Sequence, residues 1–228
     1  MSLWYKILIW ILPVLFAVTV HEVAHAWLAC KLGDKTAHDN GRLSLNPLKH
    51  VDLFGSIVVP GTLLVVSGFV FGWAKPVPID VQQLDHPKRD MGLVALAGPL
   101  ANLLMLVLWA LLMKLGLAIM LPYPVIGAVL VYMGAAGILI NAALMMLNLL
   151  PLPPLDGGRV LTSLLPSQQA IWLLKFERWG LFILFILLIS GMVTKIIWPL
   201  MVFPMALVTQ LLNIPTDTFT SSLSTLLN

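Results

Sequence analysis

Three residues near the start of the sequence, His21, Glu22 and His25, have types and a spacing that suit hydrolytic metal chemistry. On an α-helix the two histidines lie about 40° apart around the axis and about one turn apart along it, so both rings can bind one tetrahedral Zn²⁺. Glu22 projects beside them, where a carboxylate can take a proton from a water molecule whose pKa zinc lowers to about 7. The pattern therefore predicts a metal centre with its own general base.

The surroundings of these residues are apolar, which makes their presence informative. Ionisable groups among lipid-facing residues cost about 2.5–3.5 kcal/mol each on insertion scales and rarely occur there without a function. The five-residue pattern alone leaves an alternative, because two histidines four residues apart also occur as hydrogen-bonded residues in helix bundles. A catalytic zinc usually has three protein ligands and an open fourth position, so we expect a third ligand elsewhere in the chain.

The composition defines the environment of this centre. The chain has 228 residues, of which 60% are hydrophobic and only 10% charged, with a mean hydropathy of +0.98. These values exclude an ordinary water-soluble domain with one buried core. We predict an all-α polytopic membrane protein, a helical bundle of about four to six transmembrane segments. The single cysteine, Cys30, excludes both an internal disulfide framework and a cysteine-rich zinc site.

We expect the whole chain, 1–228, to form one integral-membrane domain, with a catalytic core at about 3–165 and C-terminal spans within about 172–212. The segment from Leu53 to Trp73 is apolar but is interrupted by glycines and Pro60, which favours a re-entrant or shallow membrane loop over a full crossing. The predicted spans are about 3–30, 91–120, 125–150 and 176–193, and the tail 196–212 is left open as a crossing or an interfacial segment.

A second candidate motif follows the fourth apolar segment. It starts at Asn148, continues through Pro151, Pro153 and Pro154, and ends in Asp156-Gly157-Gly158. The prolines preclude a regular helix through the loop, and the glycines let the backbone turn tightly beside a metal. Taken alone, the same residues also suit a turn at a helix end.

Together with His21-Glu22-x-x-His25, this stretch resembles the site-2 protease family of intramembrane zinc metalloproteases. A further match is Ala97-Gly98-Pro99-Leu100-Ala101-Asn102, and several short loop motifs look like the bacterial subgroup without extra domains. The resemblance implies that Asp156 is the third ligand of one Zn²⁺ per chain and that Glu22 is the catalytic base. It also implies regulated intramembrane proteolysis, with membrane proteins or peptides as substrates cut within or near their transmembrane segments.

Two amide side chains in the apolar helices, Asn102 and Asn148, are further candidates. Each can donate a hydrogen bond to a substrate carbonyl or an oxyanion and accept one from a peptide N–H. The alternative is hydrogen bonding between helices, which asparagine commonly makes in membrane bundles. For Asn148 the family motif supports substrate contact, whereas Asn141, seven residues earlier, fits a packing role better.

The topology follows from bringing Asp156 back to the histidines. The helix that ends near Leu150 must then finish on the face where the first helix ends, so the 53–73 segment cannot cross. On that topology ten of the thirteen Lys and Arg residues lie on the active-site face, which the positive-inside rule identifies as cytoplasmic. We therefore expect a multi-pass protein of the cell (inner) membrane, with its active site toward the cytoplasm.

Two other classes share parts of the pattern. A non-catalytic zinc-binding membrane scaffold or a metal transporter would use the same ligands but would give Glu22 no reason to be acidic. A diiron membrane enzyme needs more histidines than the five present here. We expect lipid and membrane-protein partners and no nucleic acid, and a homo-oligomer is left open.

Overall fold

The computed structural model describes residues 1–52, 54–55 and 74–227. All the regular elements in these ranges are helical, which confirms the predicted all-α class. They are α1 (Leu3–Lys31), α2 (Thr36–Asp39), the 3₁₀ turns η1 (Pro47–Lys49) and η3 (Val81–Gln83), α4 (Pro87–Ala118), α5 (Pro124–Asn148), α6 (Asp156–Leu164), α7 (Ser167–Leu174), α8 (Glu177–Ile189), α9 (Met192–Leu211) and α10 (Thr216–Leu227).

Three helices in the described part of the chain, α1, α4 and α5, are long and apolar enough to cross a membrane. Helices α4 and α5 each begin with a proline, whose missing N–H costs nothing in the first helical turn. They pack closely because small residues line the contact: a Cβ on Gly134 would lie 2.5 Å from the Cβ of Met113. This arrangement is a helical membrane bundle, as the composition predicts.

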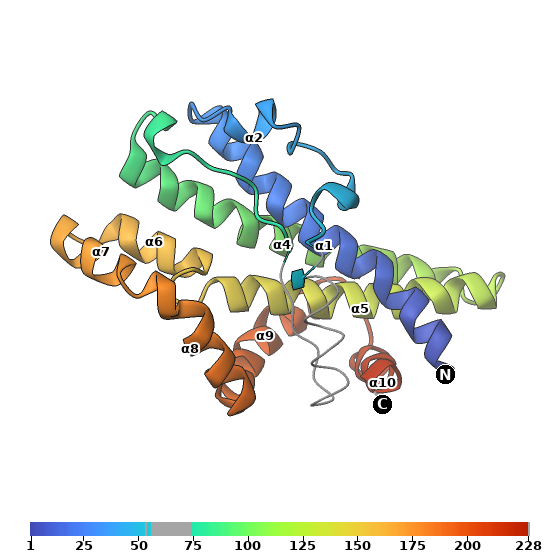
Figure 1. Ribbon diagram of the computed structural model, residues 1–228. Helices are drawn as coiled ribbons and strands as arrows, with labels where there is room; N and C mark the ends of the chain where they lie inside the picture. The colour runs from blue at the N-terminus through green and yellow to red at the C-terminus, as the bar shows by residue number, and fades with distance from the viewer. Residues whose placement is uncertain (53, 56–73, 228) are drawn as a thin grey trace.

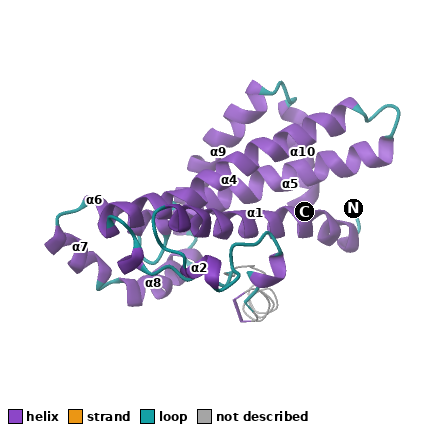
Figure 2. Ribbon diagram, turned by 90° about the horizontal axis from the view of Figure 1, so that it is seen from above, coloured by secondary structure: helices purple, strands orange, loops and turns teal. Residues whose placement is uncertain are grey.

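Helices α1, α4 and α5 all contact one another and form the centre of the molecule (Figure 1). Helices α9 and α10 pack against α5, while α6 packs against α4 and continues into α7. The two termini lie toward the same end of the molecule in both views (Figures 1 and 2). The main core combines α4, α5, α9 and α10 with residues such as Leu106, Met113, Ile138, Met205 and Leu223.

The C-terminal part differs from the prediction in two places. The predicted span 176–193 is not one helix, because α8 ends at Ile189 and Gly191 adopts a left-handed conformation (φ 72°) before α9 begins. At 13 residues, α8 is shorter than the roughly 20 residues that a crossing needs. Helix α10 was not predicted at all; it is amphipathic and buries Phe219, Leu223 and Leu226.

Hydrogen bonds join the two polar stretches on one side of α1. The carboxylate of Asp34 is fully buried and accepts hydrogen bonds from the backbone N–H groups of Thr36 and Asp80. The N–H of Lys75 donates to the carbonyl of His50 over 2.9 Å. The two flanks of the segment 53–73 therefore meet on one side. The predicted re-entrant loop itself lies outside the described residues.

Candidate metal centre

Three predicted ligands come together although 131 positions separate His25 from Asp156 (156 − 25). The Nε2 atoms of His21 and His25 lie 3.0 Å apart, and Oδ2 of Asp156 lies 3.2 Å from the first and 3.3 Å from the second. All three residues are buried. Helix α1 places the histidines on one face, and Asp156 is the first residue of α6, after the proline-rich turn that follows α5.

The outer nitrogens of the two rings determine what the inner nitrogens can do. Nδ1 of His25 lies 2.7 Å from the backbone carbonyl of Val94, and Nδ1 of His21 lies 2.7 Å from Oδ1 of Asn102. Both oxygens are acceptors, so each Nδ1 carries the proton and each neutral ring presents a lone pair at Nε2. In this neutral form neither ring can donate to Asp156, whose buried Oδ2 has no hydrogen-bond partner among the described residues.

This arrangement fits a metal ion better than it fits a hydrogen-bonded cluster. Three buried acceptors facing one another repel unless a cation lies between them. Tetrahedral zinc with bonds of about 2.0 Å separates its ligand atoms by about 3.3 Å, close to the observed distances. The three residues could hold Zn²⁺.

Helix α4 makes room for the centre at Gly98. A Cβ there would lie 2.4 Å from Nε2 of His25 and 2.5 Å from Cε1 of His21. Only a residue without a side chain fits at this position. Val94, Gly98 and Asn102 are spaced four residues apart, so they form one stripe along α4 that faces both histidines. The stripe fixes how α4 and α1 align.

Glu22 is half-buried on α1, and its Oε2 accepts a hydrogen bond of 2.9 Å from the backbone N–H of Val77. Val77 belongs to the segment that follows the 53–73 region, and it packs against Ala26 and Ala37. The guanidinium of Arg42 donates to the carbonyls of Lys75 and Pro76 in the same segment. A strap without regular secondary structure, residues 74–79, therefore contacts α1 through Val77 and holds the carboxylate of Glu22.

The asparagine candidates have different surroundings. Asn102 is fully buried, and its Nδ2 donates to the carbonyl of Ala17 and to Oδ1 of Asn141, so no N–H remains for a substrate oxyanion. Asn148 is half-buried and donates to the carbonyl of Leu144 in its own helix. A substrate contact for Asn148 stays a prediction. Sequence reasoning missed Val77 and Val94, because both act through backbone groups that leave no trace in residue type.

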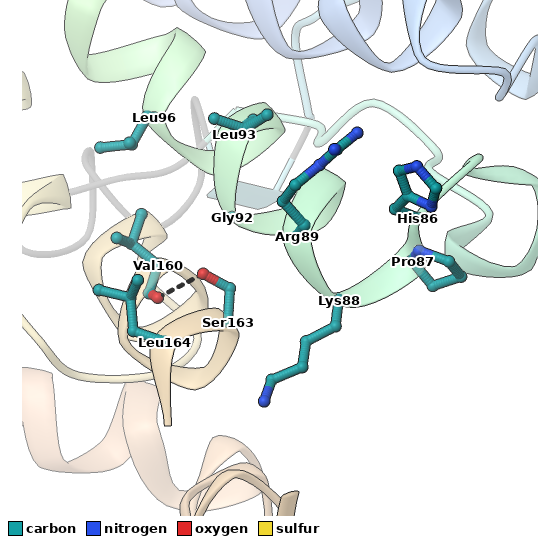
Figure 3. A pocket seen from close by; sticks show the side chains of 10 residues that line it. All are labelled: His86, Pro87, Lys88, Arg89, Gly92, Leu93, Leu96, Val160, Ser163 and Leu164. Carbon is teal, nitrogen blue, oxygen red and sulfur yellow. Dashed lines mark hydrogen bonds between the residues drawn. The ribbon is translucent and has the colours of Figure 1, made fainter. Parts of the chain in front are cut away.

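A separate groove of about 580 Å³ lies between the start of α4 and α6 (Figure 3). His86, Lys88 and Arg89 lie on its α4 side near the start of the helix, and the rest of the lining is mostly apolar, with one hydroxyl group from Ser163. Nζ of Lys88 donates to the carbonyl of Leu165, which follows α6. The groove contains none of the three candidate ligands.

A bundle of apolar helices that buries two histidines and an aspartate beside a glutamate has the components of a membrane-embedded metallohydrolase. Comparison with known proteins agrees with this class. The sequence model of Peptidase family M50 matches residues 118–191. The chain is 35% identical to "Putative zinc metalloprotease YwhC" of Bacillus subtilis over 195 residues, which cover 84% of each protein.

A second relative is the Rip2 protein of Mycolicibacterium smegmatis, which has the same description. It is 31% identical over 177 residues, covering 77% of this chain and 64% of the relative. No solved structure matches the chain. The chain belongs to the site-2 protease family, Peptidase family M50, and is a metalloprotease.

Proposed function

We propose that the protein is an intramembrane zinc metalloprotease that hydrolyses peptide bonds within or near the transmembrane segments of membrane proteins. One Zn²⁺ per chain would be held by His21, His25 and Asp156, with Glu22 as the catalytic base. The observation that carries this proposal is the convergence of three buried ligand atoms, two imidazole nitrogens on the membrane-spanning helix α1 and one carboxylate oxygen on α6, within 3.0–3.3 Å of one another.

The position of the histidines along α1 supports cleavage inside the membrane. At 1.5 Å per residue, His25 and His21 lie about 9 and 15 Å from Lys31, where the helix ends in the polar loops. The hydrocarbon core of a bilayer is about 30 Å thick. A substrate bond would therefore meet the centre inside the membrane, in the half of the bilayer that adjoins the loops.

Each residue then has a defined task. When bound, zinc supplies Lewis acidity toward the scissile carbonyl and toward the attacking water. Glu22 accepts the proton that the water loses and delivers it to the departing amine, while the N–H of Val77 holds the carboxylate in one orientation. A helical substrate hides its carbonyls in hydrogen bonds, so the bond to be cut must unwind locally before it reaches the centre.

The orientation in the membrane is part of the proposal. The loops and helix ends beside the centre carry Lys31, Lys35, Arg42, Lys75 and Arg89, and the positive-inside rule assigns such a face to the cytoplasm. We infer a location in the cell (inner) membrane with the centre open to the cytoplasmic side. Single-span membrane proteins or peptides derived from them are the expected substrates.

The test compares purified wild-type protein with the Glu22→Gln variant. We expect one zinc per chain in both, and cleavage of at least one peptide in a panel of single-span peptides by the wild type. Loss of the general base should slow cleavage by about 10²–10⁴-fold. Zinc binding without any cleavage by the wild type would indicate a scaffold or transporter instead. A wild type that binds no zinc would contradict the proposal entirely.

A further inference from the structure

A chain of hydrogen bonds leads from the candidate metal centre into a third helix. Nδ1 of His21 on α1 contacts Oδ1 of Asn102 on α4 at 2.7 Å. Nδ2 of Asn102 contacts Oδ1 of Asn141 on α5 at 2.9 Å, and Nδ2 of Asn141 contacts the carbonyl of Gly137 at 2.9 Å. Both asparagines are fully buried.

Backbone carbonyls fix the orientation of both amides. Nδ2 of Asn102 also faces the carbonyl of Ala17 at 3.2 Å, and a carbonyl can only accept, so the amide nitrogen of Asn102 must lie on that side. The Gly137 carbonyl fixes Asn141 in the same way. From His21 through Asn102 to Asn141 the donors therefore follow one another from α1 through α4 into α5, and such aligned hydrogen bonds strengthen one another.

We propose that Asn141, which does not touch the metal centre, is a positioning residue that acts through Asn102 to keep the proton of His21 on Nδ1. With the proton there, Nε2 of His21 is free to bind zinc, and the aligned amides increase its electron donation. This inference rests on the proposed function, since it concerns how the same centre acquires its metal.

The consequence of removing Asn141 can be stated at atomic level. Asn102 would lose one of the two acceptors that hold its amide. If the amide turned over, its NH₂ group would face Nδ1 of His21 and favour the tautomer that carries the proton on Nε2. That tautomer cannot bind zinc. A mere packing role for Asn141 predicts a less stable bundle with unchanged zinc affinity.

The experiment measures the zinc dissociation constant by competition with a chelator, together with thermal unfolding of the metal-free protein. We expect Asn102→Leu to weaken zinc binding by about 10–100-fold and Asn141→Leu by about 10-fold, the range found when outer partners of metal ligands are removed. The double variant should bind no more weakly than Asn102→Leu alone, since the two residues act in series.

Two further variants control for lost hydrogen bonds and for shape. Thr209→Val removes a buried donor to Met205 in α9, far along the chain from the centre, and should leave zinc affinity unchanged. Asn141→Asp, protonated in its buried site, keeps an acceptor for Asn102 and a donor for Gly137 and should bind zinc like the wild type. If Asn141→Leu does not accumulate, Asn141→Ala replaces it.

The possible outcomes separate this inference from the proposed function. Wild-type affinity in the Asn141 variants, with only a lower unfolding temperature, overturns the positioning role and leaves the proposed function intact. Absence of zinc binding in the wild type overturns the proposed function. In that case nitrogen NMR of His21 still tests the positioning role of Asn141. Asn141→Leu should shift the proton population of the ring from Nδ1 toward Nε2, and an unchanged spectrum would contradict this role.

Discussion

The candidate metal centre and the groove beside it both lie along helix α4, but they differ in how their polar groups are held. At the centre, the outer nitrogen of each histidine has a buried partner, and the two rings pack so closely against Gly98 that no side chain would fit there. At the groove, Lys88 and Arg89 are exposed, and Lys88 donates to a helix-end carbonyl while Arg89 donates to the neighbouring Asp90. The charged side chains at the groove face solvent, whereas those at the centre are buried.

This difference separates a buried site that suits chemistry, the candidate metal centre, from a solvent-exposed surface, the groove. Catalysis needs ligands held within fractions of an ångström, and at this centre the outer nitrogen of each histidine is held by a buried acceptor on α4. Exposed cations at the membrane surface need only remain near water and headgroups. The following predictions test this contrast, from the largest expected effect to the smallest.

Gly98→Ala should have the largest effect. The new methyl group would lie 2.4 Å from Nε2 of His25, and neither histidine can move without losing its partner on α4. We expect loss of measurable zinc binding and a destabilisation of about 1–3 kcal/mol from overpacking. Leu100→Ala, on the exposed side of the same helix, is the control and should bind zinc normally. Normal zinc affinity in Gly98→Ala would show that the centre is looser than described.

Zinc should stabilise the wild-type bundle. At a free zinc concentration 100 times the dissociation constant, binding raises the free energy of unfolding by about 2.7 kcal/mol. Asp156→Asn removes the ligand charge at nearly constant shape and should abolish most of this gain. Thermal unfolding with and without a chelator measures both. Equal stabilisation of the two proteins would place the metal elsewhere.

Val77→Pro tests the strap over Glu22. Proline has no backbone N–H and therefore removes the hydrogen bond that Glu22 accepts from Val77. A hydrogen bond to a charged group contributes about 1.5–3 kcal/mol. We expect cleavage to slow by about 10-fold or more with zinc content unchanged. Val77→Ala keeps the N–H and loses only side-chain packing, so it should remain near wild type. Similar losses in both variants would assign the effect to packing.

Lys88→Met should have the smallest effect. It removes the side-chain hydrogen bond to the carbonyl of Leu165 at the exposed groove, a surface interaction of about 1 kcal/mol or less. Zinc affinity should not change, as a chelator competition assay would show. A clear loss of zinc binding would mean that the groove and the centre are mechanically linked through α6.

The sequence predicted the long helices and the convergence of His21, His25 and Asp156 because residue types carry those signals. Ionisable side chains in apolar helices require partners, and three motifs in order indicated which ones. The strap could not be found in this way, since its contact with Glu22 is a backbone N–H. The Asn141 contact left a weak signal, because a second buried amide in an apolar helix also needs a partner.

The C-terminal part was harder to predict because its signals are local. Ser190-Gly191 breaks the apolar stretch that was taken as the span 176–193, and a single glycine inside such a stretch is compatible with either outcome. Helix α10 has many serines and threonines, and no element was predicted for this segment. Its buried residues Phe219, Leu223 and Leu226 have helical spacing, and that periodicity was the available signal.

The stripe formed by Val94, Gly98 and Asn102 makes the centre sensitive to how two antiparallel helices slide past one another. Moving α4 by a single residue would turn the stripe about 100° away from the histidines and break both outer contacts together. Metal occupancy would then report helix register inside the bilayer. Bound zinc, measured after one alanine is inserted between the loops and Val94, would therefore show how far the alignment of α4 and α1 controls metal binding.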